Sequence, residues 1–122
     1  MNEGQKLWKK AEKIIPGGNG LLSKRPDRYL PKIWPTYFSK SKGINIWDLE
    51  NNKFTDMAQM GMGTCILGYA NDNIDQKVKN IIDKGINSTL NCPEEFVLAE
   101  KILKYDKFAD QVKFAKGGGE AM

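Results

Sequence analysis

Apolar residues recur at helical spacing near the N-terminus of the chain. The first such face has members at i, i+4, i+7 and i+8: Leu7, Ala11, Ile14 and Ile15. Residues 16–18 (Pro-Gly-Gly) predict the end of this helix, because proline and glycine do not continue it. Trp8 lies beside the predicted face. The face is therefore expected either to pack on the core or, together with Trp8, to form a dimer contact.

Two further helices are predicted in the second half of the chain. One has the apolar positions Ile74, Val78, Ile81 and Ile82. Asn71 or Asp72 is expected to cap it, and Gly85 follows its end. The other is expected to begin at Pro93, and its apolar positions include Phe96, Leu98, Ile102 and Leu103.

Between the first and second helices the pattern predicts a long loop and then short strands. Residues 17–35 contain repeated glycine and proline, so an extended loop is expected there. Long loops in compact domains are often functional, which makes four of its residues candidates to bind an anion, or else solvated surface groups: Ser23, Lys24, Arg25 and Arg28. Alternating apolar residues around a polar turn predict a small antiparallel meander over residues 37–57.

Several acidic and glycine positions invite a functional interpretation. Asp48 and Asp56 resemble a carboxylate pair, but each follows a strand beside a turn, so we expect them to bond the backbone. Residues 60–68 contain two glycines at the spacing of a dinucleotide-binding motif but lack the third one. The alternative interpretation of these glycines is a backbone bend near a ligand.

The last residues predict a strand, a glycine turn and the start of a helix. Val112 and Phe114 alternate with lysines, residues 117–119 are all glycine, and Glu120 is a good helix former. Such a junction presents free N–H groups and the positive end of a helix dipole, which suits a phosphate. The alternative is an ordinary glycine-rich loop.

Composition narrows the class of protein. The formal net charge is +4 from 19 basic and 15 acidic residues, and the two signs are interleaved, so we expect no nucleic-acid groove. Histidine is absent, which removes the commonest general base and zinc ligand. Cys65 and Cys92 have no CxxC partner and are expected to be free thiols in a reducing compartment. No apolar run is long enough to span a membrane and no signal peptide is recognised, so a cytoplasmic location is expected.

Five motifs, taken in order, resemble the N-terminal part of the class III pyridoxal-phosphate (PLP) dependent aminotransferases. The resemblance is strongest to the branch that includes glutamate-1-semialdehyde aminomutase. Residues 15–18 resemble its IPGG, residues 42–48 its KGxxxWD and residues 66–69 its ILGH. Residues 93–100 resemble PxExxLAE, and residues 112–121 resemble VRFxxSGTEA.

The resemblance implies an α/β fold of the aspartate aminotransferase-like type (fold type I). Residues 1–70 would form an N-terminal helix, loop and antiparallel meander, and residues 71–122 the start of the large PLP-binding domain with the first strand and turn of its parallel sheet. The Schiff-base lysine and the aspartate that pairs with the pyridine nitrogen would lie beyond Met122. The chain is therefore expected to be an N-terminal fragment without catalytic residues and inactive by itself.

The resemblance also implies a site. Backbone N–H groups of Gly118 and Gly119 would hold the PLP phosphate, although Gly119 replaces the family's usual hydroxyl residue. Ser23 and Arg25 would contact the anionic end of the substrate, and Met62 stands where the aminomutase has tryptophan. The full-length homodimer would transfer an amino group between an amino compound and a carbonyl compound through a cofactor aldimine. The alternatives from other classes are a non-catalytic oligomerisation module and an unrelated phosphate-binding module.

Overall fold

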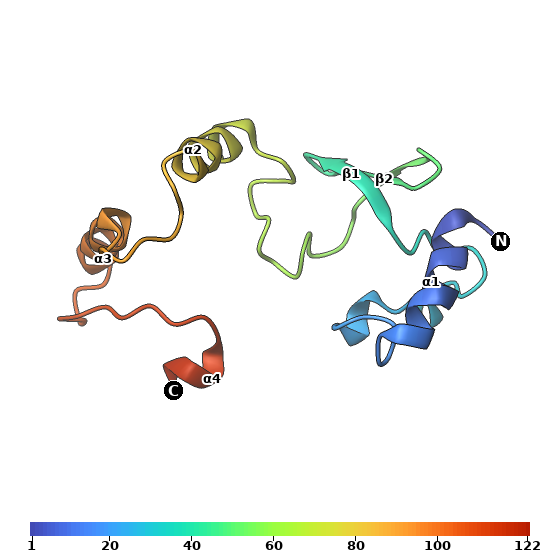
Figure 1. Ribbon diagram of the computed structural model, residues 1–122, viewed down its shortest axis with the longest axis horizontal. Helices are drawn as coiled ribbons and strands as arrows, with labels where there is room; N and C mark the ends of the chain where they lie inside the picture. Colours follow the sequence, from blue (N-terminus) through green and yellow to red (C-terminus); the bar gives the residue numbers. More distant parts are fainter. The chain divides into compact units, whose positions relative to one another are not determined.

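The computed structural model describes residues 1–122, which divide into two compact units. The first unit is Met1–Lys79 and the second is Asn80–Met122. Figure 1 follows the chain from helix α1 through the strands to helices α2, α3 and α4. A domain boundary at residue 70 stays a prediction.

Helix α1 spans Glu3–Ile14 and ends before residues 16–18 (Pro-Gly-Gly), as the sequence predicts. The Oδ1 atom of Asn2 accepts a hydrogen bond from the Gln5 N–H at 2.7 Å and so caps the first turn. The residue after the helix, Ile15, has an extended backbone (φ −120°, ψ 118°) because the next residue is proline.

The buried face of α1 is not the predicted one. Leu7 and Ile14 are 40% and 81% exposed, whereas Trp8 is only 6% exposed. The large apolar residues pointed to the wrong face because three of the four real contact positions are small or polar. The buried residues of the helix are Gly4, Gln5, Trp8 and Ala11. Trp8 is therefore a core residue of this chain and does not form an exposed dimer contact.

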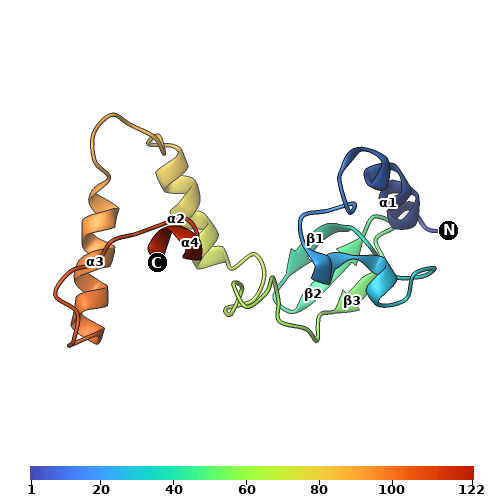
Figure 2. The ribbon, with the colours of Figure 1, turned by 90° about the horizontal axis from the view of Figure 1, so that it is seen from below.

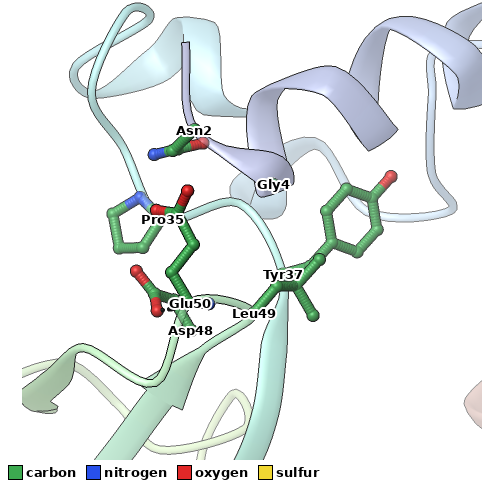
Figure 3. A pocket seen from close by; sticks show the side chains of 7 residues that line it. All are labelled: Asn2, Gly4, Pro35, Tyr37, Asp48, Leu49 and Glu50. Atoms are coloured by element: carbon green, nitrogen blue, oxygen red, sulfur yellow. Dashed lines mark hydrogen bonds between the residues drawn. The ribbon is translucent and has the colours of Figure 1, made fainter.

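Gly4 lets α1 approach the chain that leads into the meander. A Cβ atom at Gly4 would lie 3.3 Å from the backbone nitrogen of Thr36 and 3.5 Å from that of Tyr37. Figure 3 shows the narrow crevice at this contact, where Asn2 and Gly4 face Tyr37 and the turn that carries Asp48. A small residue is needed here because the two backbones nearly touch.

The glycines after α1 serve the same core. Gly18 has φ +77°, and a Cβ atom there would lie 2.4 Å from the ring of Trp8. Gly17 has φ +71° but no comparably close neighbour. The IPGG motif is thus a helix stop whose second glycine supports the buried indole.

Residues 22–28 of the predicted loop form two short 3₁₀ turns, Leu22–Lys24 and Pro26–Arg28. The meander follows as predicted. Strands β1 (Phe38–Lys42), β2 (Asn45–Asp48) and β3 (Lys53–Thr55) form an antiparallel sheet in the order β1-β2-β3 (Figure 2). These strands form the only sheet of the chain.

The backbone-bonding role predicted for Asp48 is confirmed. Its Oδ1 atom accepts the N–H groups of Glu50 and Asn52, each at 2.9 Å, and its Oδ2 atom accepts the Asn52 side-chain amide at 2.9 Å. Burial alone would raise the pKa of this carboxyl, but the three hydrogen bonds outweigh it and hold the pKa below its ordinary value. Asp48 therefore holds the β2–β3 turn.

Two of the sequence motifs meet in one backbone contact. Gly43, in the β1–β2 turn, exchanges hydrogen bonds with Tyr69: its N–H donates to the Tyr69 carbonyl at 2.9 Å, and the Tyr69 N–H donates to its carbonyl at 2.8 Å. Gly68 has φ +86°, and a Cβ atom there would lie 3.2 Å from the Cα of Gly43. The glycines of KGxxxWD and ILGY thus pack against each other.

Helices α2 (Asp72–Ile82) and α3 (Pro93–Tyr105) confirm the two predicted later helices. Asn71 caps α2, since its Oδ1 atom accepts the Ile74 N–H at 3.3 Å, and Gly85 follows with φ +92°. No residue of either helix is buried in this chain. None of the helices combines the length and the apolar character that crossing a lipid bilayer requires.

The strand predicted at residues 112–116 is not formed. Residues 111–115 have no regular secondary structure, and the short helix α4 spans Gly118–Ala121. A strand needs a hydrogen-bonded neighbour, and these 122 residues provide none for this segment. The glycine turn and the start of a helix are nevertheless present as predicted.

Candidate functional site

The first unit contains an open cleft with about 740 Å³ of solvent space, a size typical of small-molecule sites. The loop before β1, strands β2 and β3, the segment after β3 and Tyr69 line this cleft. Most lining side chains are apolar or aromatic, among them Leu30, Ile33, Phe54 and Met57.

Two stacked aromatic rings form one wall of the cleft. Tyr29 and Trp34 lie with ring centroids 4.4 Å apart and planes inclined by 17°. The Tyr29 hydroxyl donates to the Ser23 carbonyl at 2.6 Å. The buried Gln5 side chain donates to the Trp34 carbonyl at 2.8 Å, so α1 fixes the position of this wall.

A left-handed turn forms another part of the lining. Met60, Gly61, Met62 and Gly63 have φ values of 35°, 69°, 60° and 83°. Two of these residues are not glycine, and each of those costs about 1 to 2 kcal/mol in a left-handed conformation. Such strain is characteristic of ligand-binding segments, and Met62 lines the cleft. The backbone bend predicted for this segment is therefore present.

Tyr69 and Asp56 form a polar pair in the cleft lining. The Tyr69 hydroxyl donates to the Asp56 carboxylate at 2.5 Å, and that carboxylate also accepts the Ala58 N–H at 2.8 Å. Burial and this hydrogen bond raise the pKa of Tyr69 to about 12. Tyr69 thus remains a neutral donor at physiological pH, and Asp56 bonds the backbone as predicted.

The structure separates the two predicted substrate residues. Ser23 lines the cleft, and its hydroxyl donates to the sulfur of Met62 at 3.5 Å. Arg25 does not line the cleft, and its guanidinium makes hydrogen bonds of 3.0 and 3.2 Å to both carboxylate oxygens of Asp27. The pairing raises the pKa of Arg25 and lowers that of Asp27.

The predicted phosphate turn lies in the second unit. No protein acceptor takes the N–H groups of Gly118 and Gly119, and a Cβ atom at either residue would meet nothing within 4 Å. The Glu120 carboxylate accepts the Lys116 N–H at 3.1 Å. This carboxylate therefore bonds the protein, which is needed because a carboxylate facing a phosphate would repel it. Two free N–H groups on an unobstructed turn fit the phosphate of PLP.

Sequence reasoning missed the aromatic wall and the apolar lining of the cleft. Tyr29 and Trp34 stand in a proline-rich loop where no periodicity marks an inward face. The available signal was the concentration of large apolar residues in a loop otherwise expected to be polar.

Curated relatives match nearly the whole chain. Glutamate-1-semialdehyde 2,1-aminomutase of Sulfurisphaera tokodaii is 32% identical over 117 residues, which cover 96% of this chain and 27% of the relative. The enzymes of that name from Methanocaldococcus jannaschii and Wigglesworthia glossinidia brevipalpis are 31% and 35% identical over 99% and 95% of this chain, and 27% and 26% of their own lengths. The chain therefore spans about a quarter of these relatives. No protein-family model matches it.

Solved structures agree in fold. The FumI protein of Sphingopyxis sp. MTA144, in its PLP internal aldimine form, matches with a TM-score of 0.81 and 29% identity over 97% of this chain and 28% of its own. An omega-transaminase from Sphaerobacter thermophilus matches with a TM-score of 0.82 and 24% identity over 98% of this chain and 26% of its own, a likeness of fold. The predicted fold class is confirmed. The predicted resemblance to the N-terminal part of the class III PLP-dependent aminotransferases, and to glutamate-1-semialdehyde 2,1-aminomutase among them, is confirmed in sequence and in fold.

Proposed function

We propose that residues 1–122 form the N-terminal segment of a PLP-dependent aminotransferase or aminomutase. Such an enzyme transfers an amino group between an amino compound and a carbonyl compound. The observation that carries this proposal is the agreement of sequence and fold over almost the entire chain, at 32% identity to one relative and a TM-score of 0.81 to another. We also propose a cytoplasmic location for this enzyme, because Cys65 and Cys92 are both free thiols and reducing compartments keep thiols free.

Gly118 and Gly119 are proposed to bind the cofactor phosphate through their backbone N–H groups. Both groups lack a protein acceptor, and neither glycine has a side chain that would obstruct the phosphate. With no hydroxyl at Gly119, the backbone must supply this contact alone. PLP itself, when bound, supplies the electron sink for a carbanion at the amino-bearing carbon.

The cleft of the first unit is proposed to receive the substrate. Ser23 would donate its hydroxyl to the substrate's anionic end, which requires only that it leave the weak acceptor Met62. Arg25 would have to exchange its two bonds to Asp27 for the substrate anion. The aromatic wall and the Tyr69–Asp56 pair would orient the substrate.

A homodimer is proposed for the enzyme that carries this segment. Large apolar side chains remain exposed on both later helices, including Ile74 and Val78 on α2 and Phe96 and Leu98 on α3. Surfaces of this kind are covered in stable proteins by other parts of the chain or by a partner. Sedimentation of the purified enzyme should give twice the monomer mass, and a monomeric holoenzyme would contradict the dimer.

The phosphate assignment is tested by Gly118→Val in the enzyme that carries this segment. A Cβ atom at this position would meet nothing within 4 Å in the present residues, so the fold of the segment should survive the substitution. Its bulk beside the N–H groups should weaken PLP binding at least about tenfold, the loss of one charge-assisted hydrogen bond. A titration followed by PLP absorbance measures this effect.

Gly20→Val is the matched control, because a Cβ atom at Gly20 also meets nothing within 4 Å and this glycine lies far along the sequence from the turn. The control should bind PLP normally. Unchanged PLP affinity in a folded Gly118→Val protein would reject the phosphate assignment. A folded wild-type oligomer indifferent to PLP would instead favour a non-catalytic module.

A further inference from the structure

Six consecutive residues of the cleft lining belong to one loop, residues 57–68, which connects β3 to the segment before α2. The loop includes the left-handed turn of residues 60–63, and its lining residues are 57–62. Apolar packing does not hold it, since Met57 and Ile66 are 89% and 85% exposed. Hydrogen bonds must therefore keep these residues in place beside the cleft.

The hydrogen bonds inside the loop give it its shape but do not attach it to the sheet. The Cys65 N–H, for example, donates to the Met60 carbonyl at 3.2 Å. Between its ends, the loop has one hydrogen bond to the rest of the first unit, from the Ser23 hydroxyl to the sulfur of Met62 at 3.5 Å. A thioether sulfur is a weak acceptor, so this bond contributes little.

The two ends of the loop are attached to the sheet and to each other. The Asp56 N–H donates to the Ile44 carbonyl at 2.8 Å, and Tyr69 exchanges two backbone hydrogen bonds with Gly43. The Tyr69 hydroxyl then joins the ends directly, because it donates to the Asp56 carboxylate at 2.5 Å. The same carboxylate accepts the Ala58 N–H at 2.8 Å, in the first turn of the loop. The side-chain bond between Tyr69 and Asp56 thus closes the base of the loop.

The Tyr69 hydroxyl also lies beside the left-handed turn. Burial and the bond to Asp56 raise the pKa of Tyr69 to about 12, and the backbone amide of Gly61 is near enough to act in the opposite direction. The hydroxyl keeps its proton at neutral pH, so the donor is always present. Its loss would leave a partly buried carboxylate without one of its donors, which costs free energy.

We propose that Tyr69 is a positioning residue of the cleft, because its hydroxyl, bonded to Asp56, fixes loop 57–68 and so sets the shape of the lining. The inference rests on the proposed function for the use of the cleft. A lining already in its bound shape costs less to order when a substrate binds. The strained φ values of Met60 and Met62 persist only where the surroundings hold them. The family motif ILGH has histidine at this position, so the hydroxyl is a feature of this chain.

Tyr69→Phe in the complete enzyme tests the proposal, because it removes the hydroxyl and keeps the ring. Hydrogen exchange is followed by mass spectrometry of peptides. The amides of residues 57–68 should exchange at least about tenfold faster than in wild type, the effect of losing one hydrogen bond to a charged group. Peptides that cover β2 should exchange within about twofold of wild type, because both edges of that strand stay paired.

Alkylation by iodoacetamide gives a second measurement. Cys65 is half-buried, and a Cβ atom at Gly61 would lie 3.2 Å from its sulfur. If Tyr69→Phe releases the loop, Cys65 should be alkylated about tenfold faster, in step with the exchange of the loop amides. Cys92 is already exposed, so its rate should not change.

Asp56→Ala removes the acceptor of the same hydrogen bond. In this background Tyr69→Phe should accelerate exchange of the loop by less than about twofold, because the bond is already absent. Tyr37→Phe is the matched control. Tyr37 belongs to the same unit, does not line the cleft and makes no side-chain hydrogen bond, so this variant should exchange like wild type.

Unchanged exchange of the loop in folded Tyr69→Phe would overturn the proposal. Equal acceleration in the loop and in β2 would also overturn it, because it would indicate a loss of overall stability. So would a full effect of Tyr69→Phe in the Asp56→Ala background.

These measurements need no catalytic turnover, which separates the inference from the proposed reaction. A loop fixed by Tyr69 in a protein without amino transfer would reject the proposed function and support the role of Tyr69. Amino transfer by a protein whose loop exchanges independently of Tyr69 would reject the role of Tyr69 alone.

Discussion

At the scale of single residues, the structure needs its glycines for two different reasons. Some have a positive φ that other residues rarely adopt, and others lie so close to a neighbouring group that a side chain would not fit. Gly17 needs only its positive φ of 71°. Gly18 needs a positive φ of 77° and also lies against the ring of Trp8. A Cβ atom added to Gly18 would lie 2.4 Å from that ring. Trp8 is the only aromatic residue buried in the chain, so its support is a large part of the core.

This difference predicts unequal effects of the same substitution. Gly17→Ala should lower the free energy of unfolding by about 1 to 2 kcal/mol, the cost of a left-handed alanine. Gly18→Ala should lower it by about 2 to 4 kcal/mol, because the methyl group also overpacks the indole. Urea denaturation of the two variants, followed by tryptophan fluorescence, measures both values. Equal losses would show that Trp8 does not press on Gly18.

At the scale of elements, local signals identified the helices and the meander. Asn71, Pro93 and Gly85 mark helix ends by their own chemistry, so α2 and α3 could be predicted without knowledge of their surroundings. The buried face of α1 could not be predicted in this way. Gly4 is buried because two backbones approach closely there, and Gln5 is buried because its side chain makes a hydrogen bond. Periodicity of apolar residues does not register such contacts.

The cleft could not be predicted from the sequence for the same reason. Its aromatic wall depends on Gln5 holding the Trp34 carbonyl, a contact between residues 29 positions apart. The left-handed turn at residues 60–63 contains two methionines, which have no preference for that conformation. The predicted strand at 112–116 failed for the complementary reason: its own alternation is correct, but a strand also needs a partner.

The β2–β3 turn should make stability depend on pH. Asp48 has a lowered pKa in the folded protein, so its contribution is complete above the unfolded value of about 3.9 and is lost as pH falls through the folded value below it. Asp48→Asn removes the charge and sets an amide against the Asn52 side-chain amide. The variant should be less stable than wild type at pH 7, and the difference should shrink below pH of about 4.

Denaturation midpoints between pH 7 and pH 2.5 test this expectation. Asp110→Asn serves as the control, because Asp110 is exposed, and its curve should run parallel to that of wild type. A stability difference between Asp48→Asn and wild type that stays constant down to pH 2.5 would show that the carboxylate's charge is unimportant in the turn.

At the scale of the whole molecule, burial is concentrated in the first unit. The last buried residue is Asp48, and none of residues 49–122 is buried. The motifs of the first unit contact one another through Trp8 and Gly18 and through Gly43 and Gly68. The second unit presents its apolar side chains without partners, as expected of surfaces that pack on other parts of a larger protein.

Hydrogen exchange of the 122-residue chain should therefore differ between the two units. Helix α3 has 13 residues and no buried side chain, and isolated helices of this length are marginal in water. Its amides should exchange with protection factors below about 10, whereas the paired amides of β2 should exchange at least about tenfold more slowly, because both of its edges are bonded. Mass spectrometry of peptides that cover the two elements measures both rates. Amides of α3 that were protected as strongly as those of β2 would show that the second unit gains its stability from within these 122 residues. The exposed face of α3 would then no longer argue for packing against further protein.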